Sequence, residues 1–563
     1  LHNKKYYTKM RKLILLIVAI FAANLTTNAA APVKTITGNI SGNVMWNYDT
    51  IYLLSGKVYL INGATLTIAP GTIIKGDYSA AGSALIVTRG AKIYAIGEPS
   101  RPIVFTSSQT PSNRATGDWG GLVIAGNAKV NVPGGIGTFE GGNLANPNAG
   151  GGGPADGQFG GLNDLDNSGE LKYVRIEYAG YPFAPNNELN GLTMGGVGSG
   201  TKISYVQVSY GFDDSFEWFG GTVSCSHLIS YRTNDDDFDS DFGFRGNVQF
   251  GVALRDTAVA DAVSGANSFE SDNDATGTNL TPTTAPVYSN MTLVGPQFTP
   301  STNINANFKR GAHIRRNSRA SIFNSVFMGW PVGIKIDGDS CHRNADSLWL
   351  EVQNSVIAAS ALPLDSTAGA LWNISPWYNV AANANTTYAA NSSVMLTDPF
   401  NYTSPDFRPL AASPMLTGAG FSNSKLTNPN IDQTPTYRGA FGATNWMDKW
   451  SSFTSDTNSY TDGIGPEIPE GTFDISKNIQ LVEVYPNPAQ NVTSISFTLL
   501  NKEQASIIVS DISGNILFSE TKPATIGRNI VEINTSGLAS GLYIIKIVAG
   551  NSMHSAKLNV IKM

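Results

Sequence analysis

Short apolar runs separated by glycine, asparagine, aspartate and proline fill the chain from about residue 36 to residue 453. Early examples are residues 66–68, 85–87 and 103–105. The intervals between these runs are too short for the crossover helices that usually join parallel strands. Strands that follow each other this closely and still stack in parallel form a coil, in which each turn buries its apolar side chains against its neighbours. The pattern therefore predicts an all-β fold dominated by a right-handed parallel β-helix.

A repeat within residues 209–251 supports this coil. A shift of 22 residues places Asp213, Asp214, Phe216 and Glu217 on Asp235, Asp236, Phe238 and Asp239. Equivalent positions on neighbouring coils lie about 4.8 Å apart, so Phe216 should stack on Phe238 and Asp213 should lie over Asp235. A β-propeller also contains many short strands, but an offset of this size is only about half of a blade.

Alternation along the second repeat predicts two faces, because successive side chains of a strand point to opposite sides. The acidic row is predicted to be Asp235, Asp237, Asp239 and Asp241, and the aromatic row Phe238, Phe242 and Phe244. The phenylalanines gain by stacking in the core, and the carboxylates should form an outer ridge.

The β-helix domain is predicted to span residues 30–453. Two stretches without a strand pattern, residues 132–161 and 264–286, are predicted to be loops inserted into the coil. Residues 397–416 and 437–453 are predicted to be the closing turns, with Trp446 and Trp450 covering the open end of the core, since a solenoid end needs a cap.

The first 29 residues are typical of a secretory signal peptide. Lys9, Arg11 and Lys12 precede an apolar run over residues 13–23, and small residues follow up to Ala29, after which cleavage is expected. This run is well short of the roughly 18 apolar residues that a membrane span needs. The mature protein is therefore predicted to have no transmembrane anchor.

After residue 453 the composition changes. Residues 454–478 are rich in serine, threonine, proline and glycine, which indicates a linker. Residues 479–563 alternate apolar and polar side chains between turn signals and predict a small antiparallel β-sandwich. A carbohydrate-binding sandwich is the alternative, but the segment lacks an obvious row of exposed aromatic residues.

Two short motifs characterise this last segment, YPNP at residues 485–488 and GLASGLY at residues 537–543. With these motifs the segment strongly resembles the C-terminal sorting domain of type IX secretion substrates. The resemblance implies handling by the type IX secretion machinery through residues 479–563. It also implies export across both membranes of a Gram-negative cell, with the mature protein extracellular or on the outer cell surface.

The preceding domain carries a second resemblance. GFDDSFEWFGGT at residues 211–222, NDDDFDSDFGFRGNVQF at residues 234–250 and NSVFMGWPVGIKID at residues 324–337 resemble secreted bacterial β-helix proteins, related in fold to pectate-lyase-like solenoids. The resemblance covers roughly residues 35–453. It implies the fold but no established activity.

Charged residues are only 14% of the chain and the net charge is −6, with no basic patch. Nucleic acid is therefore not an expected partner. Cys225 and Cys341 lie about five coils apart, beyond disulfide reach, and are predicted to be free, mostly buried thiols.

Three acidic groupings are candidate calcium sites. The first is the stacked group Asp213, Glu217, Asp235, Asp237, Asp239 and Asp241, in which like charges repel unless a cation or a base such as Arg232 or Arg245 lies between them. The other two have the alternate oxygen ligands and glycine that open a calcium loop; they are Asp164, Asp166 and Ser168, and Asp272 and Asp274 with Glu270 nearby. Both loops lack the glutamate expected at the twelfth position, so capping of turns is the alternative.

A polysaccharide lyase or glycoside hydrolase is the alternative to a binding protein. Its catalytic acids would come from Asp213, Glu217, Asp235 and Asp239, since a glycosidase needs two carboxyl groups about 5–9.5 Å apart. His313 could supply a base, but no histidine–glycine or arginine-x-lysine pairing follows in the expected order. We therefore favour non-catalytic adhesion or binding of extracellular polysaccharide. Carboxylates in an open groove beside a base would favour the enzyme, and carboxylates consumed as ligands and turn caps would favour binding.

Overall fold

The computed structural model describes residues 30–139, 144, 146, 154–184, 187–299, 301–461, 478–511, 516–549 and 552–562. Two compact units, Leu1–Gly465 and Pro466–Met563, divide the chain. The predicted signal peptide and most of the predicted linker lie outside the described residues and stay predictions. No helix in the described ranges is long and apolar enough to cross a membrane.

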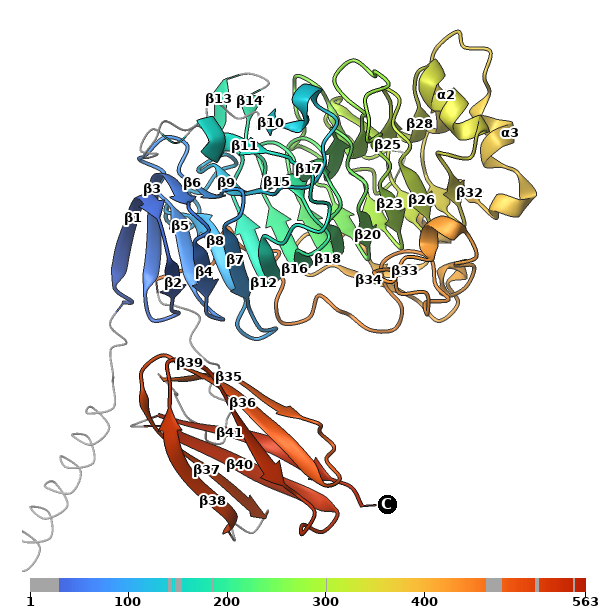
Figure 1. Cartoon of the computed structure of the whole chain (residues 1–563). Coiled ribbons are helices and arrows are strands. Elements are labelled where there is room, and N and C mark those ends of the chain that lie inside the picture. Colours follow the sequence, from blue (N-terminus) through green and yellow to red (C-terminus); the bar gives the residue numbers. More distant parts are fainter. Residues whose placement is uncertain are drawn as a thin grey trace, which may run out of the picture. The chain divides into compact units, whose positions relative to one another are not determined.

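The first unit is a parallel β-helix, as predicted (Figure 1). Its parallel strand pairs form three sheets along the coil. Each sheet continues from coil to coil through parallel pairs at neighbouring rungs. The first sheet contains β1 (Val33–Ile40), β3 (Ile51–Leu60), β6 (Ala84–Val87), β9 (Gly121–Ala125), β15 (Leu192–Val197), β17 (Phe216–Gly221), β19 (Phe238–Asp241), β22 (Ala266–Ser271), β25 (Phe308–Ile314), β28 (Val332–Ile336) and β31 (Leu362–Ser366).

The second sheet contains β2 (Asn43–Trp46), β4 (Thr65–Ile68), β7 (Lys92–Ile96), β12 (Gly169–Glu177), β16 (Lys202–Ser209), β18 (Ser224–Tyr231), β20 (Asn247–Gln249), β23 (Val287–Ser289), β26 (Ser321–Phe323) and β29 (Val352–Gln353). The third sheet combines parts of β3, β12, β16 and β18 with β5 (Ile73–Gly76), β8 (Ile103–Ser107), β21 (Val252–Leu254), β24 (Thr292–Val294), β27 (Val326–Met328), β30 (Val356–Ala358) and β32 (Thr386–Tyr388).

The core confirms the predicted stacking of rings. Phe216 and Phe238 are in register, and their parallel rings lie 5.5 Å apart between centroids. Phe269 continues the column at 5.7 Å. Phe242 departs from the predicted aromatic row: it has a left-handed backbone (φ 47°), which breaks the alternation, and its ring packs on Phe219 outside the main core.

The two predicted insertions differ from expectation. Residues 264–286 are not one loop, because β22 lies within them and pairs with β19 and β25 as a full rung of the first sheet. The described part of residues 132–161 contains a short antiparallel pair, β10 (Gly137–Thr138) and β11 (Gln158–Phe159). Phe159 packs against Phe219, so this segment covers the outer side of the first sheet at β17.

Side chains at one corner of the coil form an outer aromatic column. Tyr173, Tyr205, His227 and Phe250 all have a positive φ and stack at 4.3–4.9 Å between successive centroids. A corner between two sheets needs a sharp turn, and the left-handed conformation supplies it. Stacking with the neighbouring coil offsets the strain of that conformation in a large residue.

The segment over residues 397–461 corrects the predicted cap. After β33 (Leu396–Asp398) and β34 (Asp406–Pro409) it runs back along the outside of the coil instead of closing its end (Figure 1). Trp446 packs edge-on against His227 at 5.0 Å, and the Thr461 carbonyl accepts a hydrogen bond from the Ala31 N–H. We call this segment the return strap. It shields the aromatic column from water.

Two short helices cover the last coil of the core. They are α2 (Asp339–Asp346) and α3 (Ile374–Tyr378). Cys341 and Ala345 of α2 and Ile374 and Tyr378 of α3 are buried in the main core cluster. Cys341, like Cys225, is a buried free thiol, as predicted.

Two glutamines anchor the return strap. Gln207 donates from Nε2 to the Ser452 carbonyl (2.6 Å) and accepts at Oε1 from the Ser452 N–H (2.8 Å). Gln249 makes the same pair of bonds with Asp432, both at 2.8 Å. The amide of each glutamine thus forms the two hydrogen bonds with the strap backbone that a neighbouring β-strand would otherwise form.

Gln207→Ala should loosen the strap around Ser452, because two partly buried backbone groups lose their partners, at a cost of at most about 1–3 kcal/mol each. We expect faster hydrogen exchange in residues 446–458, measured by mass spectrometry. Gln249→Ala is the matched control and should speed exchange near Asp432 instead. Equal exchange at both places in the two variants would contradict separate anchors.

The second unit confirms the predicted antiparallel sandwich. One sheet contains β35 (Ile479–Tyr485), β36 (Val492–Leu499) and β39 (Gly527–Asn534). The other contains β38 (Ile516–Ala524), β37 (Glu503–Asp511), β40 (Gly541–Ala549) and β41 (Ser552–Val560). Alternating apolar side chains from both sheets form a separate core.

Candidate functional site

One column of ionisable side chains follows the outer face of the first sheet. The parallel register places the following residues on successive rungs: Glu217, Asp239, Glu270, His313, Lys335 and Asp365. We call this column the polar ladder. Its acidic end lies beside further aspartates that precede β17 and β19, so charge accumulates there.

Five carboxylates converge at that end. Oxygen atoms of Asp213, Asp214 and Asp235 all lie within 4.8 Å of one another, and the same holds for Asp214, Glu217 and Asp239. We call these five residues the acidic cluster; Asp214 belongs to both groups. The predicted placement of Asp213 beside Asp235 and of Glu217 over Asp239 is therefore confirmed.

Burial and mutual repulsion raise the pKa values in this region. The pKa values of Asp214 and Asp235 are raised well above the usual range, first by burial and then by neighbouring aspartates. Burial and the charge of Glu270 do the same for Asp239 and raise the pKa of Asp236 to about 8. Protonation or a bound cation would therefore relieve the repulsion within the cluster.

Two oxygens of the acidic cluster are buried without a hydrogen-bond partner among the described residues, Asp235 Oδ1 and Asp239 Oδ1. The other oxygens in this region are better satisfied: Asp235 Oδ2 accepts from the Ser264 hydroxyl at 2.6 Å, and Asp214 Oδ1 accepts from the Asp236 N–H at 2.7 Å. Asn190 donates to Glu217. A buried carboxylate oxygen without a donor is costly, so the two orphan oxygens need a proton or a bound cation.

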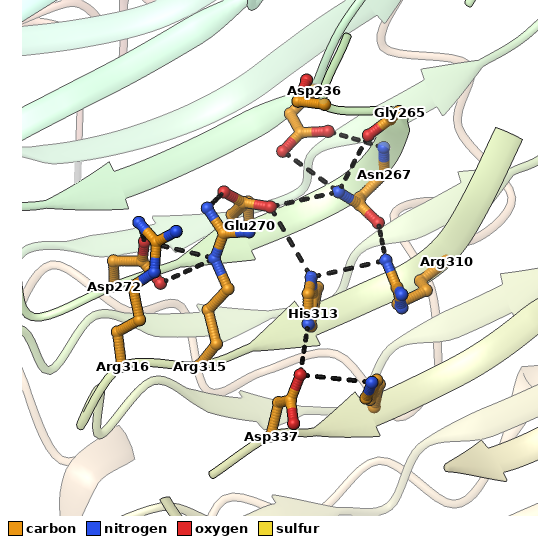
Figure 2. A network of polar contacts seen from close by, with 12 residues as sticks. Asp236, Gly265, Asn267, Glu270, Asp272, Arg310, His313, Arg315, Arg316 and Asp337 are labelled. Carbon is orange, nitrogen blue, oxygen red and sulfur yellow. Dashed lines mark hydrogen bonds and ion pairs between the residues drawn. The ribbon is translucent and has the colours of Figure 1, made fainter. Parts of the chain in front are cut away.

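The ladder continues into a paired network around His313 (Figure 2). His313 Nε2 lies 3.2 Å from Asp337 Oδ2, and Nδ1 lies 3.7 Å from Glu270 Oε2. Contact with His313, and to a lesser degree with Thr367 and Lys335, holds the pKa of Asp337 well below its usual range despite burial. Burial opposes ionisation of Glu270, but His313 and Arg315 outweigh it and lower its pKa.

A fully buried ion pair supports the same region from inside. Arg255 Nε lies 2.9 Å from Asp237 Oδ1, and both side chains are 0% exposed. Arg255 also donates to the carbonyls of Thr233 (2.6 Å) and Asn267 (2.8 Å). Hydroxyls of Ser230 and Ser268 donate to the Asp237 carboxylate.

Comparison with known proteins gives the family. A family described as "pectate-lyase like beta helix domain" matches residues 38–396, which is more than half of the chain. The chain belongs to this family. A second match, to the "secretion system C-terminal sorting domain", covers residues 483–562. The pectate-lyase-like protein is thus exported through the type IX route to the outside of the cell or to its surface.

Two similar solved structures share little sequence with the chain. The Dettilon tailspike protein is 8% identical, with 92% of this chain and 84% of that chain covered and a TM-score of 0.24. An endo-β-1,4-mannanase from Thermotoga petrophila is 7% identical, with 50% and 65% covered and a TM-score of 0.14. No protein of curated function matches the sequence. Scores this low relate neither protein's function to the pectate-lyase-like chain.

The two predicted calcium loops are held by other partners. Asp164 lies 3.4 Å from Lys129 Nζ and 3.2 Å from an Arg245 guanidinium nitrogen. Asp166 accepts from Asn127 and from Ser168. The two aspartates of this loop are therefore paired with basic and amide side chains of the β-helix domain.

The acidic side chains of the second loop are also paired with other groups of the protein. Arg315 and Arg316 each lie 3.0 Å from the Asp272 carboxylate, and Arg315 also pairs with Glu270. Asp274 accepts hydrogen bonds from Thr276 and Thr278 and caps its own turn. Asp274 thus matches the turn-capping alternative, and calcium binding by either loop stays a prediction.

One member of the predicted acidic row and one of its predicted partners are placed differently from expectation. Asp237 points inward to Arg255 rather than outward. Asp241 lies on the same face as Asp239, as predicted, since the two are alternate residues of β19, and it accepts a hydrogen bond from the N–H of Phe242. The predicted partner Arg232 instead pairs with Asp256 at 2.9 Å. The ridge is thus shorter and more buried than predicted.

Sequence reasoning missed Arg255 and Asp337. Arg255 is one coil beyond Arg232, since Tyr231 pairs with Leu254, so the repeat brings an arginine to both coils. Only the local turn decides that Arg255 points inward. Asp337 ends the quoted motif over residues 324–337, but its link to His313 needs the register of β25 and β28.

Proposed function

We propose that this is a secreted, non-catalytic glycan-binding or adhesion protein whose acidic cluster binds Ca²⁺. The observation that carries the proposal is the convergence of five carboxylates, two of whose buried oxygens have no hydrogen-bond partner in the described part of the chain. Export to the cell exterior brings such a protein into contact with polysaccharides.

The spacing of the oxygens suits a cation. Calcium binds six to eight oxygens at about 2.3–2.6 Å, so two ligands on opposite sides of one ion are at most about 5 Å apart. Each group of the acidic cluster lies within 4.8 Å. Asp214 could serve both groups, and a bound cation would replace the protons that burial and repulsion otherwise retain.

The same geometry favours binding over cleavage. Retaining and inverting glycosidases keep their two carboxyl groups about 5–5.5 Å and about 6.5–9.5 Å apart, whereas the facing oxygens within each group of the acidic cluster lie within 4.8 Å. His313 is held between Glu270 and Asp337, and Arg315 between Glu270 and Asp272. Both side chains are therefore already paired with carboxylates of the β-helix.

The face beside the cluster also offers groups that could hold a glycan. Arg316 is 42% exposed and Asp337 is 27% exposed, and both lie near the ladder. Guanidinium and carboxylate groups at such a position form hydrogen bonds with sugar hydroxyls and acidic substituents. Arg316 and Asp337 therefore supply polar groups at the surface beside the ladder.

One observation favours the alternative, a polysaccharide lyase or hydrolase. The pKa of Asp236 is raised to about 8, which would keep a proton available for a general acid at neutral pH. Asp236 is 4% exposed, however, and its Oδ1 accepts from the Asn267 N–H. A substrate would have to displace that contact.

Calorimetric titration of the metal-stripped mature protein with Ca²⁺ tests the proposal. We expect saturable heat for the wild-type protein and an affinity lower by about tenfold or more for Asp214→Asn, which neutralises the shared ligand. Asp448→Asn is the matched control, because Asp448 is exposed on the return strap. No heat from the wild-type protein would refute calcium binding.

The glycan part has its own test. Incubation with anionic polysaccharides should retard the protein in affinity electrophoresis without producing new reducing ends or unsaturated products. New chain ends that disappear in Asp214→Asn and Asp236→Asn would establish the enzyme instead.

A further inference from the structure

A cavity of about 550 Å³ lies at the side of the coil, between the end of β27 and the start of the return strap. Its walls are mostly apolar. They include Phe298, Met328, Met395, Leu396, Phe400 and Leu410. None of its lining residues belongs to the acidic cluster or the polar ladder. A small-molecule site of this kind usually has about 300–1,000 Å³ and an apolar lining with a few polar groups.

Asn391 supplies the polar group. Its side chain lines the cavity and the residue is only 9% exposed. Nδ2 donates to the carbonyls of Gln297 (2.8 Å) and Phe298 (3.0 Å). These two acceptors fix the orientation of the amide, because a flipped amide would place oxygen against oxygen.

The fixed orientation leaves Asn391 Oδ1 as an acceptor. This atom is buried and has no hydrogen-bond partner among the residues that the structure describes. A buried amide oxygen without a donor costs free energy. A ligand with a hydroxyl or N–H group would remove that cost.

Aromatic side chains give the cavity its shape. Phe298 and Phe400 meet edge to face with 5.1 Å between their centroids, and Phe298 is 60% exposed. Aromatic rings and the flexible side chains of Met328 and Met395 suit a flat apolar group. Asp398, in the same lining, would repel an anion.

We propose that this cavity binds a small neutral molecule that is mostly aromatic or hydrocarbon and carries one hydrogen-bond donor, which bonds to Asn391 Oδ1. The site is independent of the acidic cluster. It gives the protein a second ligand of a chemistry unlike that of calcium or a glycan.

The probe for the test is N-phenyl-1-naphthylamine, a neutral fluorophore with one N–H donor. We expect blue-shifted, saturable fluorescence with the full-length mature chain. The matched competitor is 1-phenoxynaphthalene, in which an ether oxygen replaces the N–H. Because this ligand leaves Asn391 Oδ1 unpaired, its inhibition constant should be about tenfold higher than the dissociation constant of the probe, which has the same size and keeps the N–H.

Two variants locate the binding. Ala390→Trp places a ring inside the cavity, and Leu410→Trp narrows it at a residue that is 43% exposed and needs no repacking of the core. Both should abolish the fluorescence change, whereas Ala368→Trp, in an exposed turn after β31, should leave it intact. Unaltered circular dichroism confirms folding of each variant.

The proposal is overturned if the wild-type chain gives no fluorescence change up to the solubility limit of the probe. It is also overturned if Leu410→Trp and Ala390→Trp bind the probe as well as the wild-type chain, or if the ether competes as strongly as the amine.

Discussion

Arg255→Met is expected to lower the free energy of unfolding of the β-helix by about 3–5 kcal/mol, because it leaves the Asp237 carboxylate buried without its counter-charge. Both side chains are 0% exposed, so water cannot solvate the remaining charge. The change also removes the donors to the Thr233 and Asn267 carbonyls. Urea denaturation followed by circular dichroism at constant pH measures the loss.

Two variants separate charge from packing. Arg101→Met removes a surface pair with Glu98, in which the side chains are 22% and 49% exposed, and should cost at most about 1 kcal/mol. Adding Asp237→Asn to Arg255→Met removes the uncompensated charge, so the double variant should be more stable than Arg255→Met alone. If the double variant is no more stable, the buried charge is not the cause.

The second large effect is a pH dependence that calcium reverses. In the metal-free protein, the raised pKa values of Asp214, Asp235, Asp236 and Asp239 mean that the folded state binds more protons than the unfolded state. The stability that these protons provide is complete below the unfolded carboxyl pKa of about 4. It is lost as the pH rises through the folded values, which for Asp236 is about 8.

We therefore expect the melting temperature of the metal-free protein to fall between about pH 4 and pH 8, with a loss on the order of several kcal/mol. Calcium binds the ionised carboxylates, so it should restore stability near pH 8, by about 2.7 kcal/mol at one hundred times its dissociation constant. It should have little effect near pH 4. Differential scanning calorimetry with chelator or with Ca²⁺ measures both slopes.

Asp214→Asn and Asp448→Asn complete this experiment. Asp214→Asn removes the charge that both groups of the acidic cluster share, so it should make the pH dependence shallower and lower the stabilisation by calcium to about 1.4 kcal/mol or less at the same calcium concentration. The exposed control Asp448→Asn should behave like the wild-type protein. Stability that rises with pH in the metal-free protein would contradict the raised pKa values.

Much of the site was predictable because stacking turns a sequence offset into a contact. The 22-residue repeat placed Phe216 on Phe238 and Glu217 over Asp239, and the register shows both. The same reasoning brought Asp213 to Asp235. This reasoning could not predict contacts outside the repeat, because the later coils carry loops of different length.

The sequence by itself determined the coil, the sandwich and the position of the acidic cluster, because apolar periodicity and the single 22-residue repeat are local properties of the chain. Only the tertiary structure decided which charges meet. Left-handed residues such as Phe242 reverse the alternation of side chains along a strand. Asp164 pairs with Arg245, which is 81 residues away in the sequence. The return strap likewise follows the aromatic column along the coil, because that column exposes apolar surface which no short-range pattern reveals.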